Sequence, residues 1–175
     1  MMTEKSKKGL FFLLKMVIAF ALAGIDQIIK HFATQGLRGK ESIVLVKNFL
    51  ALTYAENTGA AFSFMNNSTT LLSVLTLVLL VFLVGYMFFG KIETKATNVC
   101  LVMIIAGGTG NLIDRFLNGY VVDYIETLFI KFPIFNFADI LITCGAFAFC
   151  GILIYEIIKE EKAKKMALKN SDGDN

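Results

Sequence analysis

The sequence predicts a membrane protein of the all-α class, a bundle of four transmembrane helices with a small extracytoplasmic β-rich unit. Of the 175 residues, 56% are hydrophobic and only 18% are charged, which is too apolar for a water-soluble domain of this length. The apolar residues gather in four runs of about 20 residues, the length of a helix that crosses a hydrocarbon core. One domain, residues 1–175, accounts for the chain.

The four expected spans are helical because a helix pairs its backbone N–H and C=O groups internally, as lipid requires. The first span follows a basic start, as a signal peptide does, but it is too long for a signal core and ends in "DQIIK" instead of a small-residue cleavage site. It therefore reads as a retained anchor. The spans are residues 10–29, 70–90, 97–116 and 137–158.

The connection between the first two spans is rich in β-forming residues over about 38–62. Its segment "ESIVLVKNFLALTYAEN" alternates and contains a possible turn at Lys47–Asn48, so we expect a small outer hairpin or sheet with an apolar face on the membrane surface. The chain ends in a charged segment, 160–175, which we expect to be a flexible cytoplasmic tail whose lysines touch anionic lipid.

Basic residues predict the orientation of the bundle. If the N-terminus is cytoplasmic, ten Lys and Arg residues lie inside and six lie outside, while Lys15 lies within the first span, where it can snorkel. This asymmetry favours a multi-pass protein of the cytoplasmic membrane with both termini inside.

Several chemistries are excluded by what the sequence lacks. His31 is the single histidine, so clusters such as H-E-x-x-H are absent, and no G-x-S-x-G accompanies it. The three cysteines fall within the expected spans, where packing is the expected role because apolar burial makes a thiol inert. We expect no metal, no cofactor and no nucleic-acid partner.

Polar residues from independent segments fall at one membrane depth, the outer ends of the spans. Ionisable groups inside a membrane are costly and are functional candidates by default. Each also has a structural interpretation: a capping pair at Asn136 and Asp139, an ion pair of Asp114 or Arg115, a turn before Gly59. The glycines of "AGGTGN" favour tight helix packing. The residues concerned are Asp26, Asn57, Asn111, Asp114, Arg115, Asp123, Asn136 and Asp139.

Asp123 and Asp139 could act as a pair of carboxylates that shares one proton. Two acids held close cannot both ionise easily, so one pKa rises and one group serves as general base while the other serves as general acid. Asp139 lies near a helix N-terminus, which favours its ionised form. Asp123 is then the expected proton carrier, although the protons of a coupled pair belong to the pair.

Five motifs, in order, resemble the bacterial lipoprotein signal peptidases, or signal peptidase II. Each motif is weak by itself, whereas the ordered set is specific and covers nearly the whole chain between its tails. The resemblance implies four transmembrane helices with an outer β-cradle. It also implies an aspartic endopeptidase that removes the signal peptide from prolipoproteins immediately before a diacylglyceryl-modified cysteine. The motifs are "DQIIK" at 26–30, "NTGAAF" at 57–62, "GGTGNLIDR" at 107–115, "VVDY" at 121–124 and "FNFAD" at 135–139.

The resemblance also assigns roles to residues. It places the catalytic pair on Asp123 and Asp139, and it implies that Asn57 and Arg115 hold the substrate backbone. The expected partners are lipid-modified prolipoproteins and membrane lipids, and the protein is expected to be a monomer. Ile140 stands where many relatives have serine, which affects only the expected substrate preference. Further polar or supporting residues are Asn111, Asn136, Asp26, Lys30, Asp114 and Gly59.

Three other classes fit the composition less well. A proton or ion transporter would show repeats and polar groups near the midplane, and this chain has neither. A scaffold without catalysis would have no use for the polar cluster. A Ser/Lys peptidase using Ser63 or Ser68 with Lys30 would leave the two aspartates unexplained.

Overall fold

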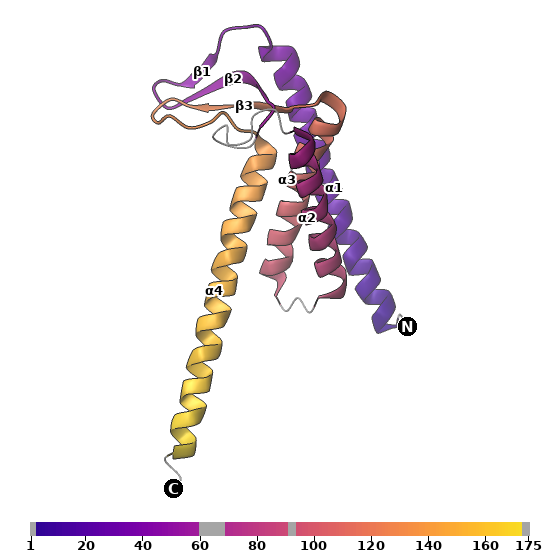
Figure 1. The fold of residues 1–175 in the computed structure, drawn as a ribbon, viewed down its shortest axis with the longest axis vertical. Helices are drawn as coiled ribbons and strands as arrows, with labels where there is room; N and C mark the ends of the chain where they lie inside the picture. The colour runs from indigo at the N-terminus through magenta and orange to yellow at the C-terminus, as the bar shows by residue number, and fades with distance from the viewer. Residues whose placement is uncertain (1–2, 60–68, 91–93, 173–175) are drawn as a thin grey trace.

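A computed structural model of the chain describes residues 3–59, 69–90 and 94–172. Four helices form a bundle, a small sheet lies across one end, and both termini point toward the other end (Figure 1). In chain order the elements are α1 (Glu4–Leu37), β1 (Ile43–Val46), β2 (Leu50–Asn57), α2 (Thr69–Phe89), α3 (Lys95–Asn118), β3 (Val121–Thr127) and α4 (Phe137–Asp172).

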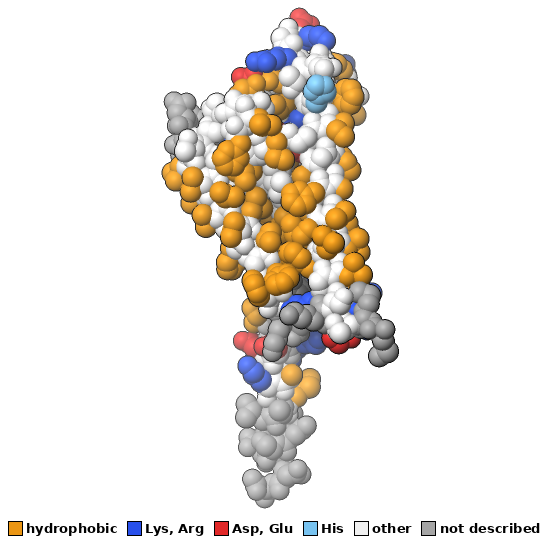
Figure 2. Space-filling model, turned by 90° about the vertical axis from the view of Figure 1, so that its right-hand side faces the viewer, with side chains coloured by type: hydrophobic (Ala, Val, Ile, Leu, Met, Phe, Trp, Pro, Cys, Tyr) orange, Lys and Arg blue, Asp and Glu red, His pale blue; other side chains and the backbone are white. Residues whose placement is uncertain are grey.

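The predicted fold class is confirmed. Four helices in the described residues are long and apolar enough to cross a membrane. Figure 2 shows hydrophobic side chains over the middle of one face, with Lys, Arg, Asp and Glu side chains toward both ends. This distribution is that of a protein with a hydrocarbon belt and two polar interfaces.

The helix α3 lies at the centre of the bundle, since 61% of its most apolar window is buried, against 11 to 17% for the other three helices. Its glycines permit this position. A Cβ on Gly107 would lie 2.3 Å from the Ala138 carbonyl oxygen of α4, and one on Gly108 would lie 2.9 Å from Leu80 of α2. A Cβ on Gly110 would lie 2.5 Å from a carboxylate oxygen of Asp26 of α1. The small-residue interpretation of "AGGTGN" therefore describes these contacts.

Two helices continue beyond the apolar runs that the sequence marks. The helix α1 reaches Leu37 instead of residue 29, because Lys30 is buried inside the bundle and Thr34 bonds back to the Lys30 carbonyl at 2.8 Å. The helix α4 reaches Asp172, so residues 160 to 172 are helical where the sequence suggests a frayed tail.

The sheet has three strands in the order β1-β2-β3, all antiparallel. The turn predicted at Lys47–Asn48 joins β1 to β2, with Asn48 in the left-handed region at φ 58°. The strand β3 is not among the elements expected from the sequence; it follows α3 after Gly119, which has a left-handed backbone conformation. This strand positions Asp123, because it places Asp123 opposite Ala55 of β2.

Candidate active site

The polar residues meet where the sheet crosses the bundle. The helices α1 and α3 contribute their C-terminal halves, α4 contributes its first turn, and β2 and β3 close the site from above. Asp123 lies in the middle of β3 and is 2% exposed. Asp139 lies in the first turn of α4 and is half-buried. Elements far apart in sequence thus bring the predicted residues together.

The start of α4 is held by a reciprocal pair of side chains. The backbone N–H of Asp139 donates to Oδ1 of Asn136 at 2.9 Å, and the backbone N–H of Asn136 donates to Oδ2 of Asp139 at 3.1 Å. The capping interpretation is therefore correct as local structure. The same geometry fixes the orientation of the Asp139 carboxylate, so capping and a catalytic role are compatible.

Asp123 accepts hydrogen bonds on both of its carboxylate oxygens. The side-chain amide of Asn136 donates to Oδ1 at 2.6 Å, and that of Asn57 donates to Oδ2 at 2.9 Å. Burial raises the pKa of Asp123 to about 6, and the negative charge of Asp139 acts in the same direction, while the two amide donors oppose the rise. The site thus favours the protonated form of Asp123 more than water does.

Asn136 connects the two aspartates, since its side chain and its backbone each contact one of them. Asn111 strengthens this connection from α3. Its amide donates to Oδ1 of Asp139 at 2.8 Å, while its own carbonyl oxygen accepts from Lys30 at 2.8 Å and from Asn136 at 3.2 Å. A carbonyl oxygen that faces two donors has only one amide orientation, so the Asn111 donor must face Asp139.

Lys30 lies at the centre of an ion cluster behind the aspartate pair. Its ammonium contacts Asp26 at 2.8 Å and Asp114 at 2.9 Å, and all three side chains are at most 3% exposed. Both acids also bind backbone N–H groups. Asp26 accepts from the N–H of Ala138 in α4 at 3.0 Å, and Asp114 accepts from the N–H of Val122 in β3 at 3.1 Å. The cluster therefore ties α1 and α3 to the two segments that carry the aspartate pair.

A cavity of about 420 Å³ opens beside Asp139. Arg115 lines it, and no acid pairs with Arg115 among the residues that the structure describes. Its Nε is buried without an acceptor. The charges of Asp139, Asp123 and Asp114 attract the guanidinium electrostatically. The cavity is lined by Asn57, Gly59, Arg115, Phe132, Pro133, Ile134, Phe135, Asp139, Ile140, Thr143 and Cys144.

Asn57 combines a turn with a contact to the site. Its Oδ1 accepts from the backbone N–H of Gly59 at 3.0 Å, while its amide donates to Asp123. The turn orients the amide, so both interpretations of Asn57 hold. Residues 60–62 of the "NTGAAF" motif, together with Ser63 and Ser68, lie outside the described residues.

Two further residues, Gln27 and Tyr124, support the site and were not singled out from the sequence. The amide of Gln27 donates to Asp114 and to the Gly110 carbonyl, each at 3.0 Å. The Tyr124 hydroxyl accepts from the backbone N–H of Phe137 at 3.2 Å, at the start of α4. Burial raises the pKa of Tyr124 to about 12, so this hydroxyl stays neutral. Gln27 directly follows Asp26 and Tyr124 directly follows Asp123. The polar side chain next to an expected site residue is the signal that could have identified each of them.

Of the other residues considered from the sequence, Cys144 lines the cavity beside Asp139, whereas His31, Cys100 and Cys150 do not line it. His31 contacts Gln35 on the exposed side of α1. Cys100 is buried, whereas Cys144 and Cys150 are exposed. In the described residues, no group of three His, Cys, Asp or Glu side chains could hold a metal ion.

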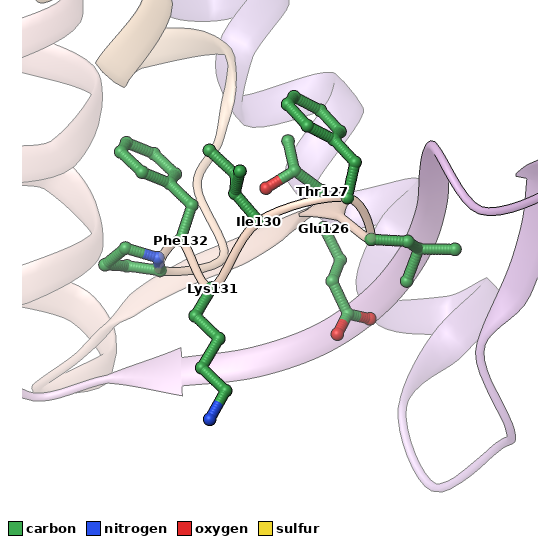
Figure 3. A pocket seen from close by; sticks show the side chains of 8 residues that line it. Glu126, Thr127, Ile130, Lys131 and Phe132 are labelled. Atoms are coloured by element: carbon green, nitrogen blue, oxygen red, sulfur yellow. The ribbon is translucent and has the colours of Figure 1, made fainter.

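A second hollow, of about 660 Å³, lies where β3 leads toward α4, along residues 126–133. Figure 3 shows Glu126 and Lys131 extending to the same side of this segment, while Ile130 points the other way. Its residues Leu128, Phe129 and Ile130 are exposed, and the Phe129 ring stacks on Phe49 with centroids 4.9 Å apart. This hollow has a largely apolar surface at the edge of the sheet and adjoins the cavity at Asp139, since Phe132 and Pro133 line both.

Comparison with known proteins decides the family. The model of the signal peptidase (SPase) II family matches residues 18–158. The chain belongs to this family. Signal peptidase II enzymes are proteases that cleave signal peptides from prolipoproteins. The match includes all the acidic, amide and basic residues described above as parts of the site.

Individual relatives agree with the family match. The lipoprotein signal peptidase of Streptococcus pneumoniae is 39% identical over 83% of this chain and 92% of its own length. That of Clostridioides difficile is 33% identical over 87% of this chain and 100% of its own length. A bacterial membrane enzyme solved in meso at 2.3 Å resolution superposes with a TM-score of 0.75 at 29% identity, over 86% of this chain and 91% of its own.

Proposed function

We propose that the protein is an intramembrane aspartic endopeptidase in which Asp123 and Asp139 form the catalytic pair. The observation that carries the proposal is the shared contact with Asn136, which donates to Asp123 at 2.6 Å and to Asp139 at 3.1 Å. The charge of Asp139 also raises the pKa of Asp123, which supports a pair that shares one proton beside the cavity lined by Asp139.

The proposed reaction hydrolyses a peptide bond without a covalent intermediate. Asp139, ionised, takes a proton from a water molecule whose oxygen attacks the scissile carbonyl carbon. Asp123, protonated, gives its proton to the carbonyl oxygen, so a neutral tetrahedral diol forms. Asp139 then protonates the leaving nitrogen, and Asp123 takes back a proton from a diol hydroxyl as the C–N bond breaks. The pair ends in its starting protonation state.

Arg115 and Asn57 are the proposed contacts to the substrate backbone. Arg115 lines the cavity and has no acid partner among the described residues, so its guanidinium is a donor that a peptide carbonyl could accept from. Gly59 lines the same cavity and leaves room for the chain. Asn111, Asn136, Asp26, Lys30 and Asp114 act by holding the pair in place.

The proposed substrate is a prolipoprotein cut immediately before its diacylglyceryl-modified cysteine. An apolar surface suited to lipid lies at the edge of the sheet beside the site. The whole of β1 is exposed although it reads Ile-Val-Leu-Val, and Phe49, Phe129 and Ile130 are more than half exposed. Apolar side chains so exposed in a membrane enzyme favour contact with acyl chains. The apolar lining of the cavity at Phe132 to Phe135 suits a signal peptide.

The proposed orientation places the site at the extracytoplasmic leaflet of the cytoplasmic membrane, with both termini inside and a monomeric bundle. The count of basic residues supports this side. A lipid-modified cysteine is anchored in the outer leaflet, so an aspartate pair at that depth would meet the scissile bond without extracting the substrate from the membrane.

The test compares matched prolipoproteins with and without diacylglycerol, using the purified protein in lipid vesicles and mass spectrometry of both products. We expect the modified substrate to be cut at a single bond, before the cysteine. The unmodified substrate should be cut far more slowly even at saturation, because loss of the acyl chains removes burial of about 0.8 kcal/mol per methylene and also removes the anchor. Equal rates on the two substrates would refute the proposed role of membrane depth, and absence of cleavage would refute the peptidase.

A further inference from the structure

Another cavity lies at the end of the bundle away from the aspartate pair, between the N-terminal part of α1 and the C-terminal end of α2. Its volume is about 740 Å³. We propose that this cavity binds the phosphate headgroup of an anionic phospholipid from the leaflet opposite the active site. Its lining residues are Glu4, Lys7, Lys8, Phe11, Phe12 and Lys15 of α1, with Met87, Phe88 and Gly90 of the α2 end.

The depth of the cavity matches a lipid headgroup. A helix rises 1.5 Å per residue, so Lys8 and Lys30 lie about 33 Å apart along α1. This distance is close to the thickness of a hydrocarbon core, about 30 Å. With Lys30 at the depth of the active site, Lys8 lies at the opposite interface. Lys15 lies two turns deeper on the same face, about 10 Å inside it.

The charges in the cavity are unbalanced. Lys7 pairs with Glu4 at 3.1 Å, whereas Lys8 and Lys15 have no carboxylate partner in residues 3–59, 69–90 and 94–172. Lys15 is partly covered by the protein, so its ammonium has limited access to water at a depth where water is scarce. Phosphate oxygens located between Lys8 and Lys15 would neutralise both ammonium groups.

The walls of the cavity suit acyl chains. The Phe12 and Phe88 rings pack edge to face with centroids 4.9 Å apart, which joins α1 to α2. Phe11 and Leu14 are more than half exposed next to the lysines. A headgroup bound at Lys8 and Lys15 would therefore continue into acyl chains that run along an apolar surface of α1. A free phosphate ion would use only the basic part, which is why we assign the site to a phospholipid.

The experiment measures phospholipid retained by the full-length protein after extraction from vesicles of equal phosphatidylglycerol and phosphatidylcholine, by native mass spectrometry. The wild type should retain phosphatidylglycerol at least tenfold over phosphatidylcholine. The double variant K8Q/K15Q should lose most of this preference, and K8R/K15R should restore it. Peptidase activity and thermal stability in detergent should stay near wild type, since neither lysine contacts the catalytic residues.

The matched control is K162Q/K164Q, which removes two charges from α4 at the same end of the molecule (Figure 1) but outside the cavity. It should retain phosphatidylglycerol like the wild type. An equal loss in this control would show that diffuse attraction is responsible and would overturn the site. Displacement of the lipid by millimolar inorganic phosphate, or equal retention of both lipids by the wild type, would also overturn it.

Discussion

Two groups of acids lie near one another in this protein and differ in how their charges are compensated. Asp26 and Asp114 enclose Lys30, and every partner in their cluster is a donor supplied by the protein. Asp123 and Asp139 have amide donors but no ammonium or guanidinium within salt-bridge distance among the described residues. They lie next to a cavity and to an Arg115 whose Nε has no acceptor.

This difference suggests a structural role for the cluster of Asp26, Lys30 and Asp114 and a role in proton transfer for Asp123 and Asp139. In the first group, which we call the closed cluster, the charges of Asp26, Lys30 and Asp114 compensate one another. Such a cluster holds secondary-structure elements together and has no free charge with which to bind a ligand. Asp123 has no cation within salt-bridge distance among the described residues, and burial together with the charge of Asp139 raises its pKa, which favours a role in proton transfer. The closed cluster also touches the backbone of Ala138 and Val122, the neighbours of the two catalytic candidates. It therefore acts as the support on which the pair is positioned.

The largest expected effect is the loss of turnover when either member of the pair becomes an amide. Asp123→Asn and Asp139→Asn should each lower turnover at least about 10³-fold, because each removes one half of an acid–base pair. Turnover on a lipidated prolipoprotein is the measurement. Near-normal turnover in either variant would refute the proposed catalytic role of the substituted aspartate.

Controls for this experiment address folding and charge. In each variant an NH2 donor replaces one carboxylate oxygen and faces an N–H donor of a neighbouring residue. This mismatch costs about 1 to 3 kcal/mol, so the melting temperature is measured alongside turnover. Glu56→Gln is the matched control on β2, next to Asn57. Glu56 is exposed and pairs with Arg38 at 2.9 Å, so this change should leave turnover near wild type.

The second effect falls on stability. Lys30→Met should destabilise the fold by about 3 to 5 kcal/mol, because Asp26 and Asp114 would remain buried without their cation. Thermal unfolding in detergent measures it. Lys47→Met, in the exposed turn between β1 and β2, is the control and should change the melting temperature little. A stable Lys30→Met protein that lacks only turnover would mean that Lys30 belongs to the chemistry and not to the support.

The sequence predicts those parts of the fold that depend on residues near one another in the chain. It does not predict those that depend on contacts between distant residues. Hydropathy locates the starts of α2, α3 and α4 within two residues, because the contrast between apolar and polar side chains is local. It ends α1 too early, because Lys30 is charged yet buried by contacts with α3. It misses β3, since a strand with an aspartate at its centre is formed by pairing with β2, more than 60 residues away.

The site shows the same limit. Motifs single out its residues, and the structure brings those described residues together. The contacts themselves, such as Lys30 with Asn111 at 2.8 Å, depend on how α1 crosses α3, and no local pattern encodes that crossing. The unused Nε–H of Arg115 likewise appears only when its surroundings are known.

A third, smaller effect tests how rigid the closed cluster is. Gly110→Ala should destabilise the protein by about 1 to 3 kcal/mol, because the new Cβ would lie 2.5 Å from a carboxylate oxygen of Asp26. Asp26 cannot move away without breaking its bonds to Lys30 and Ala138. Gly24→Ala is the control within α1, where a Cβ would meet nothing within 4 Å, and it should be neutral or stabilising by up to about 1 kcal/mol. Equal melting temperatures for the two variants would show that Asp26 can move to accommodate the new Cβ, and that the closed cluster is not rigid.

The smallest effect is the pH dependence of the pair. The pKa of Asp123 is raised to about 6 by burial and by the charge of Asp139, so above about pH 6 the pair loses its shared proton. We expect kcat/KM to fall about tenfold per pH unit beyond that point. Because the folded pKa exceeds the unfolded one, Asp123 contributes stability below about pH 4 that is lost as pH rises through about 6.

Asp123→Asn carries no titrating group at this position, so it isolates that contribution from every other acid in the protein. The wild type should lose melting temperature relative to Asp123→Asn as the pH rises from about 4 to about 6, and the difference should be constant above about pH 7. A difference that stays flat across this window would mean that Asp123 has an ordinary pKa. The amide donors of Asn57 and Asn136 would then offset both burial and the charge of Asp139, and Asp123 would have no electrostatic advantage as the proton carrier of the pair.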